Sequence, residues 1–227
     1  EYNKRDFRYS MRPLIKIDNN NLCWGVCSVT KTIDIWGRAI TNYQLPYEIQ
    51  NDSFDDLLTS NLKKIQDYLV TKVYEIVSRY FKLCYKEKEL FKLDKKGNHP
   101  RDLGDFDIIS FNPDKNTVIN IECKFFKRSY CLKDAKRDME KIFYGRDRKR
   151  RSYLERVERR HDYLNNNIIE ISDNLNLNFQ DKNKIKIISL FVTIESTYWT
   201  KYPPLKTDII FKDINELEEF LSNQLKN

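Results

Sequence analysis

"LGDFDIISFNPDKNTVINIECKFF" (residues 103–126) places charged residues on two stretches whose other residues are typical of buried strands. Between them lies "NPDKN" (112–116), in which proline, aspartate and asparagine all favour chain reversal. The whole segment is therefore predicted to form an antiparallel hairpin. Whether the turn has two residues (114–115) or four (113–116), residues whose numbers add up to 229 face each other.

This register brings three ionisable side chains to one patch. Asp107 lies opposite Glu122, and Asp105 lies opposite Lys124. Glu122 and Lys124 share one face because side chains alternate along a strand, and opposed Cβ atoms are roughly 5 Å apart. Two facing carboxylates repel unless a cation neutralises them, and Mg²⁺ binds one or two carboxylates together with water and phosphate oxygens. Two interpretations stay open: a divalent metal site, or a cross-strand salt bridge on a half-solvated hairpin.

"GDFDII" followed by "IECK" resembles the D-(x)n-(D/E)-x-K signature of the PD-(D/E)XK, or restriction endonuclease-like, nuclease superfamily, and within it the Mrr-like and Holliday-junction-resolvase-like branches. The resemblance implies that Asp107 and Glu122 hold Mg²⁺, for which Mn²⁺ can substitute. It implies that Cys123 offers its backbone carbonyl as a further ligand and that Lys124 assists the attacking water or the transition state. Such families often place a glutamate on the preceding helix, and Glu75 in "TKVYEIVSRYF" matches that position.

Some residues depart from the family pattern or have a plainer interpretation. Many relatives carry a glutamine on the helix after the lysine, whereas "LKDAKRDMEKIF" (132–143) contains none. Asp105 lies where relatives often have another polar residue, and pairing with a neighbour is its favoured role. Glu75 can equally form an ordinary ion pair with Arg79, four residues later on the same helix.

The flanking segments predict an α/β fold. Residues 51–81 carry apolar side chains at helical spacing, and residues 132–167 are predicted to be helical with a break near Gly145. Residues 184–196 and 207–212 have the composition of strands. This order predicts a mixed β-sheet with helices on both faces, and the resemblance implies that it is a restriction endonuclease-like core.

The two ends of the chain are also assigned. Residues 213–225 are predicted to be a closing helix with Asp213 as its N-cap. Residues 12–43 are predicted to be strands joined by polar turns. The predicted domains are an N-terminal β-rich extension over residues 1–50 and a nuclease-like domain over residues 51–227.

Positive charge is concentrated in one segment. The chain has 41 lysines and arginines against 34 aspartates and glutamates, and residues 133–160 alone hold twelve basic and six acidic residues. Such a segment suits contacts with a phosphate backbone, although a solvated helix face with pairs such as Glu155–Arg159 is the alternative. The candidate nucleic-acid-binding residues are Lys141, Arg146, Arg148, Lys149, Arg150 and Arg151.

Composition argues against a disulfide-stabilised scaffold, a zinc-binding module and a membrane-spanning protein. The five cysteines show no repeated metal-binding spacing, and the sequence has no signal peptide and no run of 18 apolar residues. The expectation is a cytoplasmic protein without membrane contact, and because the sequence opens on Glu1 it can be a fragment of a longer chain. A homodimer and a place in a larger protein or complex both stay open.

Together the residues and the resemblance predict a Mg²⁺-dependent DNA endonuclease, with a role in restriction or antiviral defence suggested by the family. RNA remains an alternative substrate. A non-catalytic nucleic-acid-binding module and a protein-interaction module of the same fold are the two rival predictions.

Overall fold

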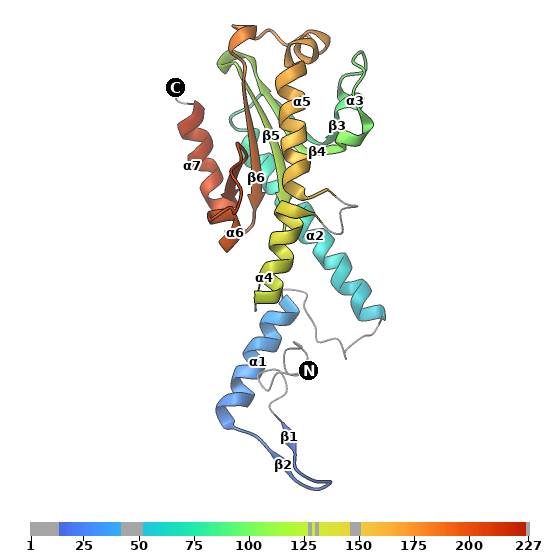
Figure 1. Cartoon of the computed structure of the whole chain (residues 1–227), viewed down its shortest axis with the longest axis vertical. Coiled ribbons are helices and arrows are strands. Elements are labelled where there is room, and N and C mark those ends of the chain that lie inside the picture. Colours follow the sequence, from blue (N-terminus) through green and yellow to red (C-terminus); the bar gives the residue numbers. More distant parts are fainter. Residues whose placement is uncertain (1–13, 42–51, 127–128, 130–131, 146–150, 226–227) are drawn as a thin grey trace. The chain divides into compact units, whose positions relative to one another are not determined.

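The computed structural model describes residues 14–41, 52–126, 129, 132–145 and 151–225 (Figure 1). The chain divides into two compact units, Glu1–Lys64 and Ile65–Asn227, which are described separately. The long helix α2 (Asp52–Val77) begins in the first unit and ends in the second. The helix predicted from the apolar spacing of residues 51–81 is present, but it ends at Val77, four residues before the predicted end.

The first unit contains a small hairpin and a helix. Strands β1 (Ile15–Lys16) and β2 (Leu22–Cys23) pair in antiparallel fashion, and helix α1 (Val26–Thr41) follows. The prediction of strands over residues 12–43 is therefore wrong for the part that forms α1, and helix rather than strand predominates among the described residues 14–41. The many β-branched residues favoured strands, but the apolar positions repeat every three or four residues, which is the spacing of a helix.

The second unit is built on a five-stranded mixed sheet with the strand order β3-β4-β5-β6-β7. Strand β4 runs antiparallel to both of its neighbours, β3 and β5, whereas β5, β6 and β7 are parallel. The mixed sheet is the one that the sequence predicts. The strands are β3 (Leu83–Glu89), β4 (Asp105–Asn112), β5 (Thr117–Lys124), β6 (Lys186–Thr193) and β7 (Ile210–Asp213).

The β4–β5 hairpin has the predicted register near its turn, but the ladder ends before the predicted pairs Asp107–Glu122 and Asp105–Lys124. Its pairs run from Asn112↔Thr117 to Ile108↔Ile121, and the residue numbers of each pair add up to 229. The connection is a single 3-10 turn (Pro113–Lys115) followed by Asn116, whose φ of 46° lies in the left-handed region that asparagine tolerates. The side chain of Asn112 accepts a hydrogen bond from the backbone amide of Lys115 and so fixes the start of the turn.

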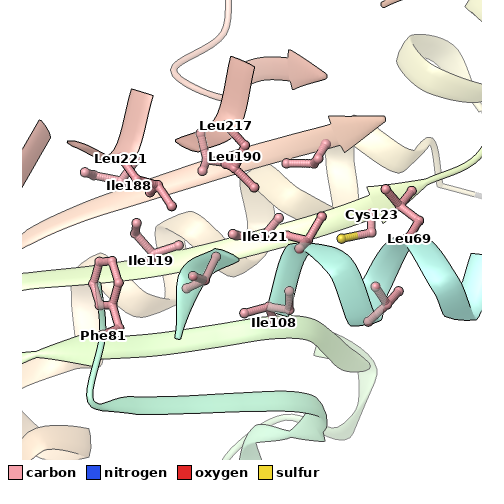
Figure 2. Packing of buried hydrophobic residues seen from close by; sticks show 14 residues of the cluster. Leu69, Phe81, Ile108, Ile119, Ile121, Cys123, Ile188, Leu190, Leu217 and Leu221 are labelled. Atoms are coloured by element: carbon pink, nitrogen blue, oxygen red, sulfur yellow. The ribbon is translucent and has the colours of Figure 1, made fainter. Parts of the chain in front are cut away.

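Helices cover both faces of the sheet. On one face α2 and α7 (Ile214–Leu225) pack against Ile119, Ile121 and Cys123 of β5, as Figure 2 shows. On the other face α5 (Tyr153–Asn174) packs against Val118 and the neighbouring strands. Residues 118 and 119 point to opposite faces because side chains alternate along a strand, so the two clusters lie on opposite sides of the sheet.

The remaining helices connect these layers. Helix α4 (Leu132–Met139) continues as a π-helical turn (Glu140–Tyr144) that ends at Gly145, whose φ is 75°. The predicted break in the helical segment is thus confirmed. Two short helices, α3 (Leu90–Leu93) and α6 (Tyr198–Lys201), and two 3-10 turns (Arg101–Leu103 and Lys182–Lys184) complete the second unit.

Two further predictions can be compared with the structure. Asp213 caps α7 as expected, since its carboxylate accepts the backbone amides of Asn215 and Glu216 at 2.9 and 3.1 Å. Among the described residues, none of the helices combines the length and the apolar character that crossing a bilayer requires.

Candidate functional site

The candidate site lies where the β4–β5 ladder ends. The β4–β5 pairs stop at Ile108↔Ile121, and the β3–β4 ladder omits the pair of Glu87 and Asp107. Glu87 has a positive φ of 50°, which marks a local irregularity in β3. The carboxylate of Asp107 instead accepts the backbone amide of Cys123 at 2.7 Å. The side chain of Asp107 is thereby fixed beside the last residues of β5.

Asp107, Glu122 and Lys124 come together at this point. The ammonium group of Lys124 is 2.7 Å from Oε1 of Glu122 and 3.4 Å from Oδ2 of Asp107. Glu122 is buried, whereas the Lys124 side chain keeps 22% of its surface exposed, so the cluster opens to solvent on the lysine side. The aromatic ring of Tyr153, the first residue of α5, lies under the ammonium group at 5.6 Å.

Asp105 does not join the cluster. It is exposed, and Lys124, which lies opposite it in the predicted register, contacts the other two carboxylates instead.

Arg160 is a member of the site that the sequence analysis did not identify. Its Nη1 donates to Oε2 of Glu122 at 2.6 Å, and its Nε donates to the backbone carbonyl of Leu103 at 3.0 Å. The guanidinium group lies over the ring of Phe106 at 5.2 Å and is almost completely buried. A signal existed, because Arg160 falls on the apolar stripe of α5 between Val157 and Leu164.

Gln66 of α2 is the second residue that the sequence analysis missed. Its amide nitrogen donates to the carbonyl of Cys123 at 2.7 Å, and its amide oxygen accepts the backbone amide of Phe125 at 3.0 Å. These two bonds give the carbonyl of Cys123 and the backbone amide of Phe125 the hydrogen-bond partners that a neighbouring strand would otherwise supply. The Cys123 carbonyl, which the resemblance assigns to a metal, is therefore hydrogen-bonded to Gln66, and a second lone pair remains on that oxygen.

The structure does not bring Glu75 to this cluster. Its carboxylate pairs with Lys72 at 2.7 Å, and its side chain is 48% exposed. Glu75 follows Gln66 by nine residues, which places the two about half a turn apart around the axis of α2. Arg79, the alternative partner that the sequence suggests, pairs with Glu218 instead.

The proximity of these charges changes their protonation. Burial and the nearby Glu122 carboxylate raise the pKa of Asp107 to about 6. Burial also acts to raise the pKa of Glu122, but Lys124 and Arg160 outweigh it and hold that pKa below its ordinary value. For Lys124, burial acts to lower the pKa, yet the two carboxylates raise it overall. At neutral pH Lys124 therefore carries its proton and Glu122 is ionised.

A divalent cation would find two carboxylates here. The described part of the chain contains no group of three or more His, Cys, Asp and Glu side chains that could hold a metal ion. Mg²⁺ tolerates such a sparse donor set, because it usually keeps several waters and takes the rest of its ligands from a phosphate. Asp107 and Glu122 offer the hard oxygens that Mg²⁺ prefers, while Lys124 and Arg160 already neutralise Glu122.

The predicted nucleic-acid-binding residues fall into two groups. Arg146, Arg148, Lys149 and Arg150 lie outside the described residues. Lys141 lies on the π-helical turn and is partly buried, and Arg151 is exposed at 3.7 Å from the carboxylate of Asp102. Arg151 also borders a cavity that Arg160 shares, so one residue of the predicted basic surface lies next to the candidate site.

Comparison with known proteins adds nothing to this geometry. No family model matches the chain, and no curated protein or solved structure matches it significantly.

Proposed function

We propose that the second unit is a metal-dependent nuclease that hydrolyses phosphodiester bonds in DNA. The observation that carries the proposal is the convergence of Asp107, Glu122 and Lys124 from two adjacent antiparallel strands. The resemblance to the PD-(D/E)XK signature assigns these three residues to catalysis, and the mixed sheet with helices on both faces is consistent with the fold that it implies. The same resemblance suggests a role in restriction or antiviral defence.

The two acids and the lysine have different roles in this proposal. Asp107 and Glu122 would hold Mg²⁺, which when bound lowers the pKa of a water ligand and polarises a phosphoryl oxygen. Lys124 keeps its proton at neutral pH, so it stabilises negative charge that develops on the phosphate rather than removing a proton from water. Its partial exposure lets the ammonium group reach a bound phosphate.

Arg160 and Gln66 act through the other residues. Arg160 orients Glu122 by holding one carboxylate oxygen, and Gln66 fixes the backbone that carries Cys123 and Lys124. Both are positioning residues, because neither is needed to contact the reacting phosphate. Their bonds keep the end of β5 in place although the ladder to β4 has already stopped.

A non-catalytic nucleic-acid-binding module is the second candidate, and one observation favours it. Two carboxylates, Asp107 and Glu122, contact two cationic side chains, Lys124 and Arg160, so the cluster is close to neutral without a metal. A buried ion network of this composition can serve to fix the ends of the strands. This module would bind nucleic acid and leave it intact.

Cleavage assays on the full chain distinguish the two candidates. Supercoiled plasmid, linear DNA and RNA oligonucleotides are incubated with Mg²⁺ or Mn²⁺ and with EDTA as the metal-free reference. We expect Glu122→Gln and Lys124→Met to lose about 100-fold or more of the rate of the wild type. Glu75→Gln is the matched control, because it neutralises an acid that lies outside the cluster.

The possible outcomes separate the hypotheses. Cleavage that Glu122→Gln and Lys124→Met leave undiminished places the chemistry elsewhere. Binding of DNA by all forms without Mg²⁺-dependent cutting favours the non-catalytic module.

A further inference from the structure

Next to the candidate site lies a cavity of about 480 Å³ with an unusually basic wall. Arg156, Arg159 and Arg160 line it from α5, and Arg151 lines it from the residue that precedes the helix N-cap. The cavity is also lined by residues 102–105, which end in the first residue of β4 and include two aspartates, Asp102 and Asp105. The volume of the cavity lies within the range of pockets that bind small ligands, roughly 300–1,000 Å³.

The acidic residues do not neutralise the four arginines. Asp102 serves two of them, since its carboxylate is 2.5 Å from Arg159 and 3.7 Å from Arg151. Arg156 makes no ion pair with any residue that the structure describes, and its guanidinium lies 5.7 Å from the ring of Tyr153. Arg160 gives one of its nitrogens to Glu122. The cavity therefore presents more guanidinium groups than the carboxylates facing them can pair.

Arg160 connects the cavity to the candidate site. With Nε bonded to Leu103 and Nη1 bonded to Glu122, its Nη2 has no hydrogen bond to any described residue and lies along the cavity wall at Gly104. A Cβ added to Gly104 would lie 3.7 Å from Nη2. Gly104 has a φ of 71°, a conformation that glycine adopts without strain, and the missing side chain leaves the approach to Nη2 open.

We propose that this cavity binds a phosphate group of a nucleotide-sized ligand. Guanidinium groups match the geometry of phosphate oxygens and donate charge-assisted hydrogen bonds to them. Arg156 and Arg159 contact the phosphate, and Nη2 of Arg160 donates a third bond. Asp105, which is exposed and forms no ion pair within the described ranges, accepts from a hydroxyl or amino group of the same ligand.

The identity of the ligand as part of a nucleic acid strand rests on the proposed function. On that basis the cavity holds a phosphate near the one that is cut, because Arg160 contacts Glu122 directly. The phosphate has two sources with the same chemistry: a terminal phosphate monoester or an internal phosphodiester. The experiment below separates them.

The test measures binding in EDTA, so that it does not depend on cleavage. Three probes are titrated into the full chain: adenosine 5′-monophosphate and one oligonucleotide with either a 5′-phosphate or a 5′-hydroxyl end. Arg156→Gln removes an exposed guanidinium of the cavity without removing an ion pair of the fold. Arg79→Gln is the control, since this exposed arginine lies two residues beyond the end of α2 and outside the cavity.

We expect Arg156→Gln to raise the dissociation constant by roughly 10-fold or more, and Arg79→Gln to change it little. A selective loss for the monophosphate and for the 5′-phosphorylated strand identifies a terminal phosphate site. An equal loss for both oligonucleotides identifies an internal phosphodiester site. The proposal is overturned if Arg156→Gln and Arg79→Gln bind every probe with the same affinity.

The same data keep the two proposals apart. If Arg156→Gln loses binding and the wild type does not cut nucleic acid, the phosphate-binding proposal is supported and the nuclease proposal is refuted. If the wild type cuts nucleic acid in a metal-dependent way and Arg156→Gln binds every probe as the wild type does, the nuclease proposal is supported and the phosphate-binding proposal is refuted.

Discussion

Replacing Arg160 by methionine tests whether the buried ion pair with Glu122 holds the site together. The two side chains are 5% and 4% exposed and their charged atoms are 2.6 Å apart. Methionine keeps a straight apolar stem over Phe106 but removes the guanidinium and its bonds to Glu122 and to the carbonyl of Leu103.

The expected cost follows from these contacts. Removing one partner of a buried pair typically costs about 3–5 kcal/mol, and leaving the Leu103 carbonyl unsatisfied costs about 1–3 kcal/mol. Lys124 remains 2.7 Å from the other oxygen of Glu122, so that carboxylate keeps one cationic partner and the first figure lies at its lower end. We expect Arg160→Met to lower the free energy of unfolding by about 4–6 kcal/mol.

Urea unfolding of the full chain measures this difference. Arg159→Met is the matched control, because the neighbouring arginine pairs with Asp102 at side-chain exposures of 36% and 55%, where an ion pair contributes about 0–1 kcal/mol. The double variant Arg160→Met/Glu122→Gln should recover part of the loss, since the buried carboxylate charge is removed as well. A cost for Arg160→Met no greater than that for Arg159→Met would refute the reasoning.

Two further predictions concern stability. Gly97→Ala should lower the melting temperature, because a Cβ at this position would lie 2.3 Å from Nε2 of the buried His99; overpacking of this kind typically costs about 1–3 kcal/mol, and a melting curve equal to that of the wild type would contradict it. For Asp107, whose pKa is raised to about 6, the folded protein binds the proton more tightly than the unfolded chain. The contribution of this group to stability is therefore full below about pH 4 and declines as the pH rises through about 6. Asp107→Asn should remove that decline, and urea unfolding of both proteins at several pH values will show whether the difference between them changes in this sense.

The local features of the site could be predicted from the sequence. Turn residues and strand alternation determine the register of the hairpin, and the register determines which side chains of β4 and β5 meet. The meeting of Asp107, Glu122 and Lys124 follows from these two rules. The helix α2 and the cap at Asp213 were equally accessible, because spacing and capping chemistry are local signals.

Contacts that join distant segments could not be predicted in this way. Arg160 and Gln66 reach β5 from helices that lie 38 and 57 residues away in the sequence from their partners. Which residue of a helix meets which strand depends on how the helix packs, and a single sequence does not specify that. For the same reason the sequence could not place Glu75 outside the site: it lies on the side of α2 away from Gln66, and which side of the helix faces β5 follows only from how the helix packs.

Helix α1 shows a different kind of failure. Its β-branched residues indicated strands, but their positions repeat with a helical period, and the period was the better guide.

Because the ladder is interrupted beside Asp107, the backbone pairing of the β4–β5 hairpin differs between its two ends. Near the turn, every residue from Ile108 to Asn112 has a cross-strand partner, and amide exchange with solvent should be slow there. At Asp107 neither ladder provides a cross-strand partner, and the carboxylate of Asp107 instead accepts the backbone amide of Cys123. The chain can thus adjust its shape around an incoming ligand at this end without unzipping the strands on which its fold depends.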